Sequence, residues 1–242
     1  MVERTRLVLV HGFTQTGRSW DTITSRLPEG FDVVAVDAPG HAGTPSTDSL
    51  WGAAEMIASV GGRATYVGYS MGARLALHVA LAHPGLVERL VLLGSTPGIR
   101  DRNERAERRR SDESLAASIV ADGVEAFLDR WLANPMFAGL GEAAAQRDDR
   151  LRNTAQGLAA SLRTCGTGAQ DDLWPRLAEL DMPTLLMAGS DDQKFVDIAS
   201  EMAPLIGAHA TVRLVEQAGH AAHLEQPGRF VELVVDWLGT TS

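Results

Sequence analysis

The sequence predicts an open, doubly wound α/β sheet that is mostly parallel and carries an inserted helical cap. Short, unbroken apolar runs recur along the chain, and amphipathic helical patterns lie between them. Most of these runs end at or next to a glycine or a polar residue. Runs that are apolar throughout are typical of strands covered on both faces, as in a parallel sheet. Strands that alternate with helices indicate repeated βαβ units.

Six apolar runs are the expected strands, and two helical patterns are especially clear. The strands are expected over 7–10, 31–36, 64–67, 90–93, 184–187 and 210–215. The helices are expected over 71–82, which stops at His83-Pro84, and over 225–238, which is amphipathic. Ligands bind at the carboxyl ends of strands in such sheets. The residues that follow each run are therefore the candidates for a functional site.

The alternation of strand and helix stops between about Pro97 and Pro183. Ala, Arg, Glu and Leu are frequent in this stretch, and runs of β-branched residues are absent. The stretch is too long for a loop inside a compact domain. We therefore expect a core formed by 1–96 and 183–242, with a helical cap inserted over 97–182.

Composition limits the class of protein and its partners. The chain has 242 residues, enough for one large domain, and a formal net charge of -9, which argues against a nucleic-acid partner. No apolar run reaches the roughly 18–20 residues of a membrane span, and the start has no apolar signal-peptide core. Its single cysteine, Cys165, excludes an intrachain disulfide and agrees with a reducing cytoplasm. We expect a cytoplasmic protein with no membrane partner; the oligomeric state is not predictable.

A serine between two glycines follows the third apolar run, in Gly68-Tyr69-Ser70-Met71-Gly72. Gly-x-Ser-x-Gly is the pattern of a nucleophile elbow, a sharp turn from strand to helix that exposes the serine hydroxyl. Glycine is needed two residues before and after the serine, because larger side chains would collide with neighbouring backbone. Here the motif follows a predicted strand and precedes a predicted helix, which is the context that an elbow requires.

Two further strand ends supply partners for this serine. A serine hydroxyl acts as a base or nucleophile when a histidine takes its proton and an acid orients that histidine. After the fifth run, Asp191 and Asp192 compete for the role of the acid. The usual Gly-x-x-Asp spacing from Gly189 favours Asp192, and Asp191 is expected to cap the next helix. His220 follows the sixth run, so the predicted triad is Ser70, Asp192 and His220.

An anion that develops at the serine needs hydrogen-bond donors already in place. The backbone amide of Met71, the residue after the serine, is one expected donor. The second is the amide of Phe13 in the loop after the first run, where Gly12 allows close approach and His11 is expected to brace the loop. No His, Asp and Glu cluster has metal-ligand spacing, and no phosphate loop or dinucleotide fingerprint occurs. We predict neither a metal nor a cofactor.

Together these residues resemble a known family. His11-Gly12-Phe13, 37–41, 68–72, Asp192 and Gly219-His220 resemble the α/β-hydrolase fold over nearly the whole chain, without its usual first two antiparallel strands. The stretches 68–74, 103–108, 131–137, 151–152, 166–174 and 189–195 further resemble the 2-succinyl-6-hydroxy-2,4-cyclohexadiene-1-carboxylate synthases, lyases of menaquinone biosynthesis that eliminate pyruvate. Asp-x-Lys-Phe after the fifth run and Trp-x5-Phe in the cap are the more specific motifs.

The resemblance implies a small polycarboxylate substrate, 2-succinyl-5-enolpyruvyl-6-hydroxy-3-cyclohexene-1-carboxylate. It implies substrate-binding roles for Arg74, Arg108, Arg152, Tyr69, Trp131 and Phe137. The chemistry agrees, because a guanidinium group matches a carboxylate bidentately, and Arg74 lies about one helical turn after Ser70. Leu132 stands where the family often has tyrosine, which removes a hydrogen-bond donor from that part of the cap.

The resemblance implies an elimination in which Ser70, deprotonated through His220 and Asp192, removes a ring proton. Two alternatives use the same residues differently. The elbow and triad equally permit a carboxylesterase or a carbon–carbon bond hydrolase. A non-catalytic ligand-binding protein of the same fold is the other alternative, and a complete triad speaks against it.

Overall fold

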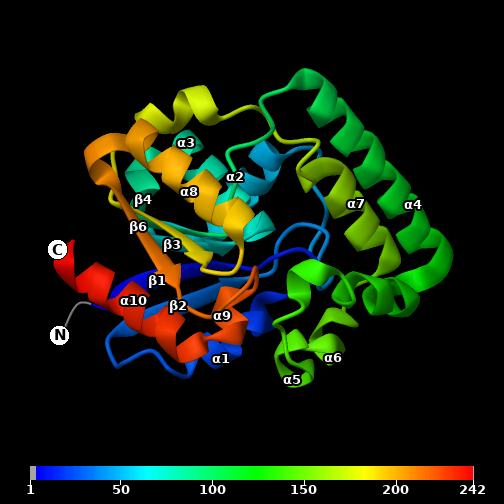
Figure 1. Cartoon of the computed structure of the whole chain (residues 1–242), viewed down its shortest axis with the longest axis horizontal. Helices are drawn as coiled ribbons and strands as arrows, with labels where there is room; N and C mark the ends of the chain where they lie inside the picture. The colour runs from blue at the N-terminus through cyan, green and yellow to red at the C-terminus, as the bar shows by residue number, and fades with distance from the viewer. Residues whose placement is uncertain (1–3, 242) are drawn as a thin grey trace.

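The computed structural model describes residues 4–241. Residues 1–3, which are part of the stretch for which no signal peptide is expected, lie outside this range. Six strands form one sheet in the order β2-β1-β3-β4-β5-β6, and every neighbouring pair is parallel (Figure 1). The strands are β1 (Thr5–Val10), β2 (Phe31–Val36), β3 (Ala64–Tyr69), β4 (Val87–Leu93), β5 (Thr184–Gly189) and β6 (Ala210–Val215). The predicted α/β fold class is confirmed, and within 4–241 the sheet is parallel throughout.

Helices cover both faces of the sheet. One face packs against α2 (Leu50–Gly61), α3 (Met71–Ala82) and α8 (Gln193–Ile206), and the other against α1 (Asp21–Thr24) and α10 (Pro227–Thr240) (Figure 1). Alternate strand residues serve alternate faces: Val8 belongs to the first core and Leu9 to the second. β3 and β5 are buried along their whole length, whereas the edge strands β2 and β6 are partly exposed. This burial explains why the inner runs are apolar throughout.

A helical cap occupies the chain between β4 and β5. It contains α4 (Arg102–Leu132), α5 (Glu142–Ala145), α6 (Arg147–Arg150) and α7 (Ala155–Cys165), which lie together to the right of the sheet in Figure 1. α4 is broken at Gly123, whose φ is 82°. α4 and α7 share a small apolar cluster of their own, formed by Ala116, Ile119, Phe127, Leu128, Leu158, Ala159 and Leu162. The two long cap helices therefore pack on each other around a small hydrophobic core of their own.

The last part of the predicted cap range packs differently. Between α7 and β5 the chain forms a 3-10 helix, Trp174–Glu179, and the side chains of Trp174 and Leu177 join the main core beside the sheet. The remaining short helices are Gly17–Trp20, Pro84–Leu86, Pro135–Phe137, Gly207–His209 and α9 (Ala222–Glu225). The segment just before β5 therefore packs against the core beside the sheet.

The strand order creates a switch point between β1 and β3. The chain builds outward from β1 to β2 on one side, and then from β3 to β6 on the other. Val10 at the end of β1 is paired with Gly68 near the end of β3. In open α/β sheets, ligands bind in the crevice outside such a switch point. The fold therefore brings the loop after β1 beside Ser70.

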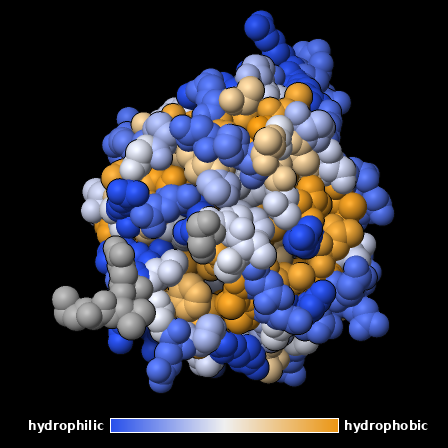
Figure 2. Space-filling view, turned by 90° about the vertical axis from the view of Figure 1, so that its left-hand side faces the viewer, coloured by the Kyte–Doolittle hydropathy of each residue, from blue (hydrophilic) through white to orange (hydrophobic). Residues whose placement is uncertain are grey.

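The face of the molecule that lies on the left in Figure 1 mixes hydrophobic and hydrophilic residues on its surface (Figure 2). Among the described residues, the large hydrophobic side chains that are exposed are Val60, Val120, Met136 and Leu205, each on a different element. Across residues 4–241, none of the helices combines the length and the apolar character needed to cross a membrane.

Four histidines, His11, His41, His78 and His223, are fully buried. Burial disfavours the charged imidazolium and lowers the pKa of His11 and His78 to about 4, and the pKa of His41 and His223 to about 3. All four rings are therefore neutral in the native protein at neutral pH.

Lowering the pH from about 7.5 to about 5 is expected to destabilise the protein, because unfolded imidazoles bind protons that these buried rings exclude. Because the native pKa values lie below the unfolded value of about 6.5, the contribution of the neutral rings to stability is fully present above about pH 6.5. This contribution is lost as the pH falls toward about 4. Each ring contributes at most about 1.4 kcal/mol per pH unit. Urea unfolding midpoints measure the effect.

The matched control for this prediction is His223→Phe. Neither ring nitrogen of His223 has a hydrogen-bond partner, and the ring lies against Trp20, Tyr69 and Phe230. Phenylalanine should fit this aromatic site and reduce the pH dependence by about a quarter. An unfolding midpoint that is the same at both pH values would contradict the expectation.

Candidate active site

Ser70 lies in a strained turn between β3 and α3. Its φ is 53° and its ψ is -109°, and its backbone N–H donates to the Leu93 carbonyl at 2.8 Å. A β-carbon at Gly72 would overlap the Val10 carbonyl, and one at Gly68 would overlap the backbone of the next turn. A serine at positive φ is uncommon and persists only where surrounding structure holds it. The elbow therefore depends on both glycines, as the motif predicts.

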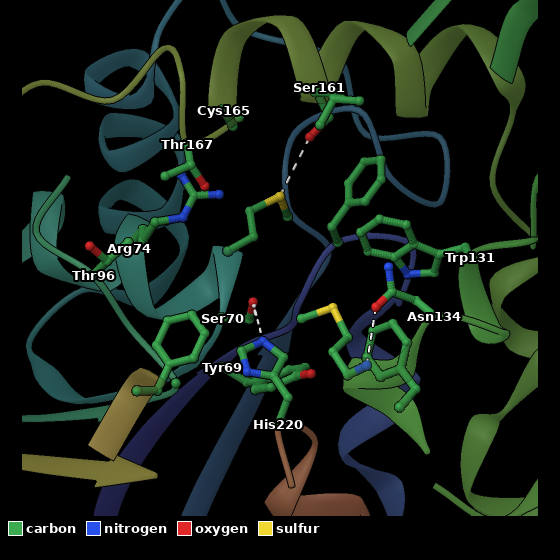
Figure 3. Close-up of a pocket in the computed structure, with 18 of the residues that line it drawn as sticks. Tyr69, Ser70, Arg74, Thr96, Trp131, Asn134, Ser161, Cys165, Thr167 and His220 are labelled. Carbon is green, nitrogen blue, oxygen red and sulfur yellow. Dashed lines mark hydrogen bonds between the residues drawn. The ribbon is translucent and has the colours of Figure 1, made fainter. Parts of the chain in front are cut away.

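Three side chains from three strand ends form one hydrogen-bonded chain. Ser70 Oγ lies 3.0 Å from His220 Nε2 (Figure 3), and His220 Nδ1 lies 2.7 Å from Asp192 Oδ2. Because Nδ1–H donates to the carboxylate, Nε2 is free to accept the serine proton. Asp191 is exposed and accepts from the Ser190 hydroxyl at 3.1 Å. The structure thus brings Asp192, and not Asp191, to the histidine.

The loop that carries His220 is held from two sides. The Glu225 carboxylate accepts the Gly219 N–H at 2.8 Å and the Ala221 N–H at 3.0 Å, so both neighbours of the histidine are fixed. Gly94, with a φ of 60°, leaves room for the ring, since a β-carbon there would approach His220 Cε1 to 3.0 Å. The sequence analysis predicted neither the role of Glu225 in holding the loop nor the role of Gly94 in leaving room for the ring.

Phe13 and Met71, whose amides are the expected oxyanion donors, line the same cavity as Ser70. Among the described residues, neither N–H donates to a protein acceptor. His11 Nε2 accepts the Ala38 N–H at 2.9 Å, so Nδ1 carries the hydrogen and donates to the Gly12 carbonyl at 2.8 Å. This geometry agrees with the expectation that His11 braces the loop.

A cavity of about 330 Å³ lies over Ser70 and His220, between the strand ends and the cap. Of the substrate-binding residues that the resemblance implies, Tyr69, Arg74, Arg108, Trp131 and Phe137 line it. In Figure 3, Arg74 with Thr167 lies on one side of Ser70, and Trp131 with Asn134 on the other. Further polar residues that the sequence did not predict also line it: Thr96, Asn134, Arg150, Ser161, Thr167 and Lys194.

The cavity is strongly cationic. Arg74 is 7% exposed, one of its terminal nitrogens has no hydrogen-bond partner, and burial lowers its pKa to about 10. Arg150 is 1% exposed and donates to the Ala145 carbonyl at 2.7 Å; burial lowers its pKa to about 10. Arg108 is half exposed, and its Nε donates to Asp112 at 2.8 Å. Buried guanidinium groups need anionic partners, so the cavity suits an anion.

The structure places one residue of the predicted set away from the cavity lining. Arg152 does not line the cavity; its side chain is 50% exposed and lies 3.8 Å from Asp149. Arg150, two residues earlier at the end of α6, takes the inward position, whereas Arg152 lies in the turn that follows. Leu132 is also outside the lining.

Arg150→Ala and Arg152→Ala are expected to differ in activity. Arg150→Ala should lower kcat/KM at least about tenfold, because it removes a buried charge from the cavity wall. Arg152→Ala should stay within about twofold, since an exposed ion pair contributes little. Steady-state kinetics on both folded variants measure this difference. Equal losses of kcat/KM in the two variants would contradict this expectation and indicate that Arg152 contacts the substrate.

The comparisons with known proteins agree with this geometry. Residues 7–233 match the model of the alpha/beta hydrolase family. The chain is 35% identical, over 96% of its length and 89% of the relative's, to a Bacillus subtilis (strain 168) protein provisionally assigned as 2-succinyl-6-hydroxy-2,4-cyclohexadiene-1-carboxylate synthase. It is 34% identical, over 93% of its length and 90% of the relative's, to the synthase of that name from Salmonella agona (strain SL483).

A solved structure, MenH from S. aureus, superimposes with a TM-score of 0.93 and 30% identity, covering 100% of this chain and 96% of that chain. Similarity of this extent includes the cap as well as the sheet. The chain therefore belongs to the alpha/beta hydrolase family and, within it, to the family of 2-succinyl-6-hydroxy-2,4-cyclohexadiene-1-carboxylate synthases.

Proposed function

We propose that this protein is a lyase that eliminates pyruvate from 2-succinyl-5-enolpyruvyl-6-hydroxy-3-cyclohexene-1-carboxylate and forms 2-succinyl-6-hydroxy-2,4-cyclohexadiene-1-carboxylate. One observation carries the proposal. Ser70, hydrogen-bonded to His220, faces a cavity that Arg74, Arg108 and Arg150 also line. A basic serine among three arginines suits a reaction on a polyanion, in which a proton is removed while carboxylates are held.

The reaction begins with proton removal from the ring. His220 takes the hydroxyl proton of Ser70, and Asp192 stabilises the imidazolium that forms. The Ser70 alkoxide then removes the ring proton α to the succinyl carbonyl. The electron pair moves onto that carbonyl oxygen and forms an enolate, which the amides of Phe13 and Met71 stabilise by hydrogen bonds.

The leaving group departs in the second half of the reaction. The enolate collapses, the electrons move through the ring double bond, and the ring carbon–oxygen bond to the enolpyruvyl group breaks. Pyruvate leaves as its enolate and takes up the proton that the substrate lost. The elimination involves no net oxidation or reduction, and Ser70 forms no covalent bond to the substrate in this scheme.

The arginines give the substrate its orientation. Arg74 has an unpartnered nitrogen one helical turn from Ser70, so it is placed to bind a carboxylate next to the reacting ring. Arg150 and Arg108 approach from the cap. Ion pairs formed in a partly dry site are stronger than in water, and positioning of the ring contributes directly to rate.

Two finer statements accompany the proposal. The partner is a small polycarboxylate rather than a nucleic acid, as the net charge of -9 and the arginine-lined cavity suggest. The location is the cytoplasm, which agrees with a single, unpaired cysteine, Cys165.

A pyruvate-release assay tests the proposal. The purified protein is mixed with the enolpyruvyl substrate, and pyruvate is followed by a coupled, NADH-dependent reduction to lactate. Release that depends on Ser70 is the expected result. A panel of aryl esters is tested in parallel, because a carboxylesterase would use the same triad. Ester hydrolysis without any pyruvate release would overturn the lyase assignment and favour the hydrolase.

A further inference from the structure

Thr14, the residue after the expected oxyanion donor Phe13, has a strained backbone. Its φ is 71°, which is unfavourable for a β-branched residue. It is fully buried, and each of its polar groups has a partner. Its N–H donates to His41 Nε2 at 3.3 Å, its Oγ1 accepts from Arg150, and its carbonyl accepts from Asn153 Nδ2 at 2.7 Å. Strain of this kind persists where neighbouring groups impose it.

Two of these partners belong to the cap. Arg150 ends α6 and Asn153 follows it, whereas Thr14 belongs to the loop after β1. The Phe13 ring also packs on the cap, with ring centroids 5.4 Å from Trp131 and 6.2 Å from Phe127. The cap therefore holds the loop through side-chain packing and through hydrogen bonds.

The hydrogen bonds form a continuous path from Asn153 to the Phe13 amide. The Thr14 carbonyl and the Gln15 N–H share one planar peptide, so fixing the carbonyl fixes the direction of the N–H. The Gln15 N–H donates to the Gly12 carbonyl at 3.2 Å. That carbonyl shares a second planar peptide with the Phe13 N–H. The bond from Asn153 to the Thr14 carbonyl therefore constrains the Gln15 N–H, and the bond from the Gln15 N–H constrains the peptide that contains the Phe13 N–H.

The orientation of the Asn153 amide is determined by its surroundings. Its Oδ1 accepts the Ala42 N–H at 3.0 Å, and its Nδ2 donates to the Thr14 carbonyl and to the Arg150 carbonyl at 2.9 Å. Asn153 is 5% exposed, so water does not readily replace these bonds. Only an amide supplies one acceptor and two donors in this arrangement.

We propose that Asn153 is a positioning residue that orients the Phe13 N–H toward the anion formed at Ser70. The cap would then take part in stabilising the transition state, besides binding the substrate. The inference rests on the oxyanion role given to Phe13 under the proposed function, but not on the identity of the substrate.

Asn153→Asp and Asn153→Ala test the proposal with two readouts. Aspartate keeps the shape but turns a negative oxygen toward two carbonyls, and alanine removes all three bonds. The first readout is the rate at which a fluorophosphonate probe labels Ser70. As Ser70 displaces fluoride from phosphorus, the transition state places a phosphoryl oxygen with developing negative charge in the same hole. The second is pyruvate release. We expect labelling and kcat to fall on the order of ten- to a hundredfold, with KM nearly unchanged.

Thr154→Ala is the matched control. Thr154 caps α7 through the Gly157 N–H at 3.0 Å and has no bond to the loop after β1, so its loss should lower stability with little change in labelling. Circular dichroism verifies that each variant is folded. If Asn153→Asp does not fold, Asn153→Ala decides the question.

Labelling within about twofold of wild type in a folded Asn153 variant would overturn the inference. Slow labelling in a protein that never releases pyruvate would retain the inference and reject only the lyase assignment.

Discussion

Replacing Ser70 with alanine is expected to abolish pyruvate release, with kcat lowered at least about 10⁴-fold. The Ser70 hydroxyl lies 3.0 Å from His220 Nε2, and alanine leaves no oxygen to remove the ring proton. Substrate should still bind, because the arginines that line the cavity remain. Single-turnover pyruvate release, with substrate binding measured separately by calorimetry, distinguishes lost chemistry from lost binding.

Ser95→Ala is the matched control for this variant. Ser95 is a buried serine just beyond β4 whose hydroxyl has no partner, and it does not line the cavity. Its removal should change kcat by no more than about twofold. Persisting elimination in Ser70→Ala would show that His220 removes the ring proton itself, which would assign the base to a different residue.

Arg74→Met is expected to lower kcat/KM about a hundredfold, which corresponds to about 2.7 kcal/mol of transition-state stabilisation. Methionine retains the length and apolar stem of the side chain but removes the charge that binds a carboxylate. Because one Arg74 nitrogen is buried without a partner, its removal should leave the melting temperature unchanged or raise it. Activity and stability should therefore change in opposite directions, which kinetics and thermal unfolding of the same preparation measure.

Two further variants complete this experiment. Arg74→Lys keeps the charge but loses the bidentate geometry, so an intermediate activity is expected. Arg109→Met removes an exposed arginine of α4 and should have little effect on either quantity. An Arg74→Met protein with normal kcat and KM would contradict a substrate contact for this residue.

The strands and the elbow could be predicted because their sequence signals are local. β3 and β5 are buried on both faces, and this burial is visible as unbroken apolar runs. The elbow requires glycine at two positions for steric reasons, and both glycines stand in the motif. Asp192 could be favoured over Asp191 because its spacing from Gly189 reflects the short turn after β5, in which the Asp192 N–H donates to the Gly189 carbonyl.

The inward side chains of the cap could not be predicted in the same way. Arg152 was expected from its motif position alone, and α6 has four residues, too few for an apolar periodicity to show which side faces the cavity. Asn153 and Glu225 act through bonds to backbone atoms distant in sequence or across a tight loop, and such bonds leave no compositional trace. These residues become recognisable only when the loops are placed in space.

The place of the cap in the chain has an evolutionary consequence. The cap is inserted between β4 and β5, which are hydrogen-bonded neighbours in the sheet. The pairing of these two strands fixes both ends of the cap, whatever residues the cap contains. Loop-closure entropy rises only slowly with length, so caps of different size are tolerated on one sheet. Exchange of the cap would preserve the contact between Ser70 and His220 but remove the bonds from Asn153 to the loop of Phe13. A chimera with a foreign cap should therefore acquire a new binding preference more readily than it acquires turnover.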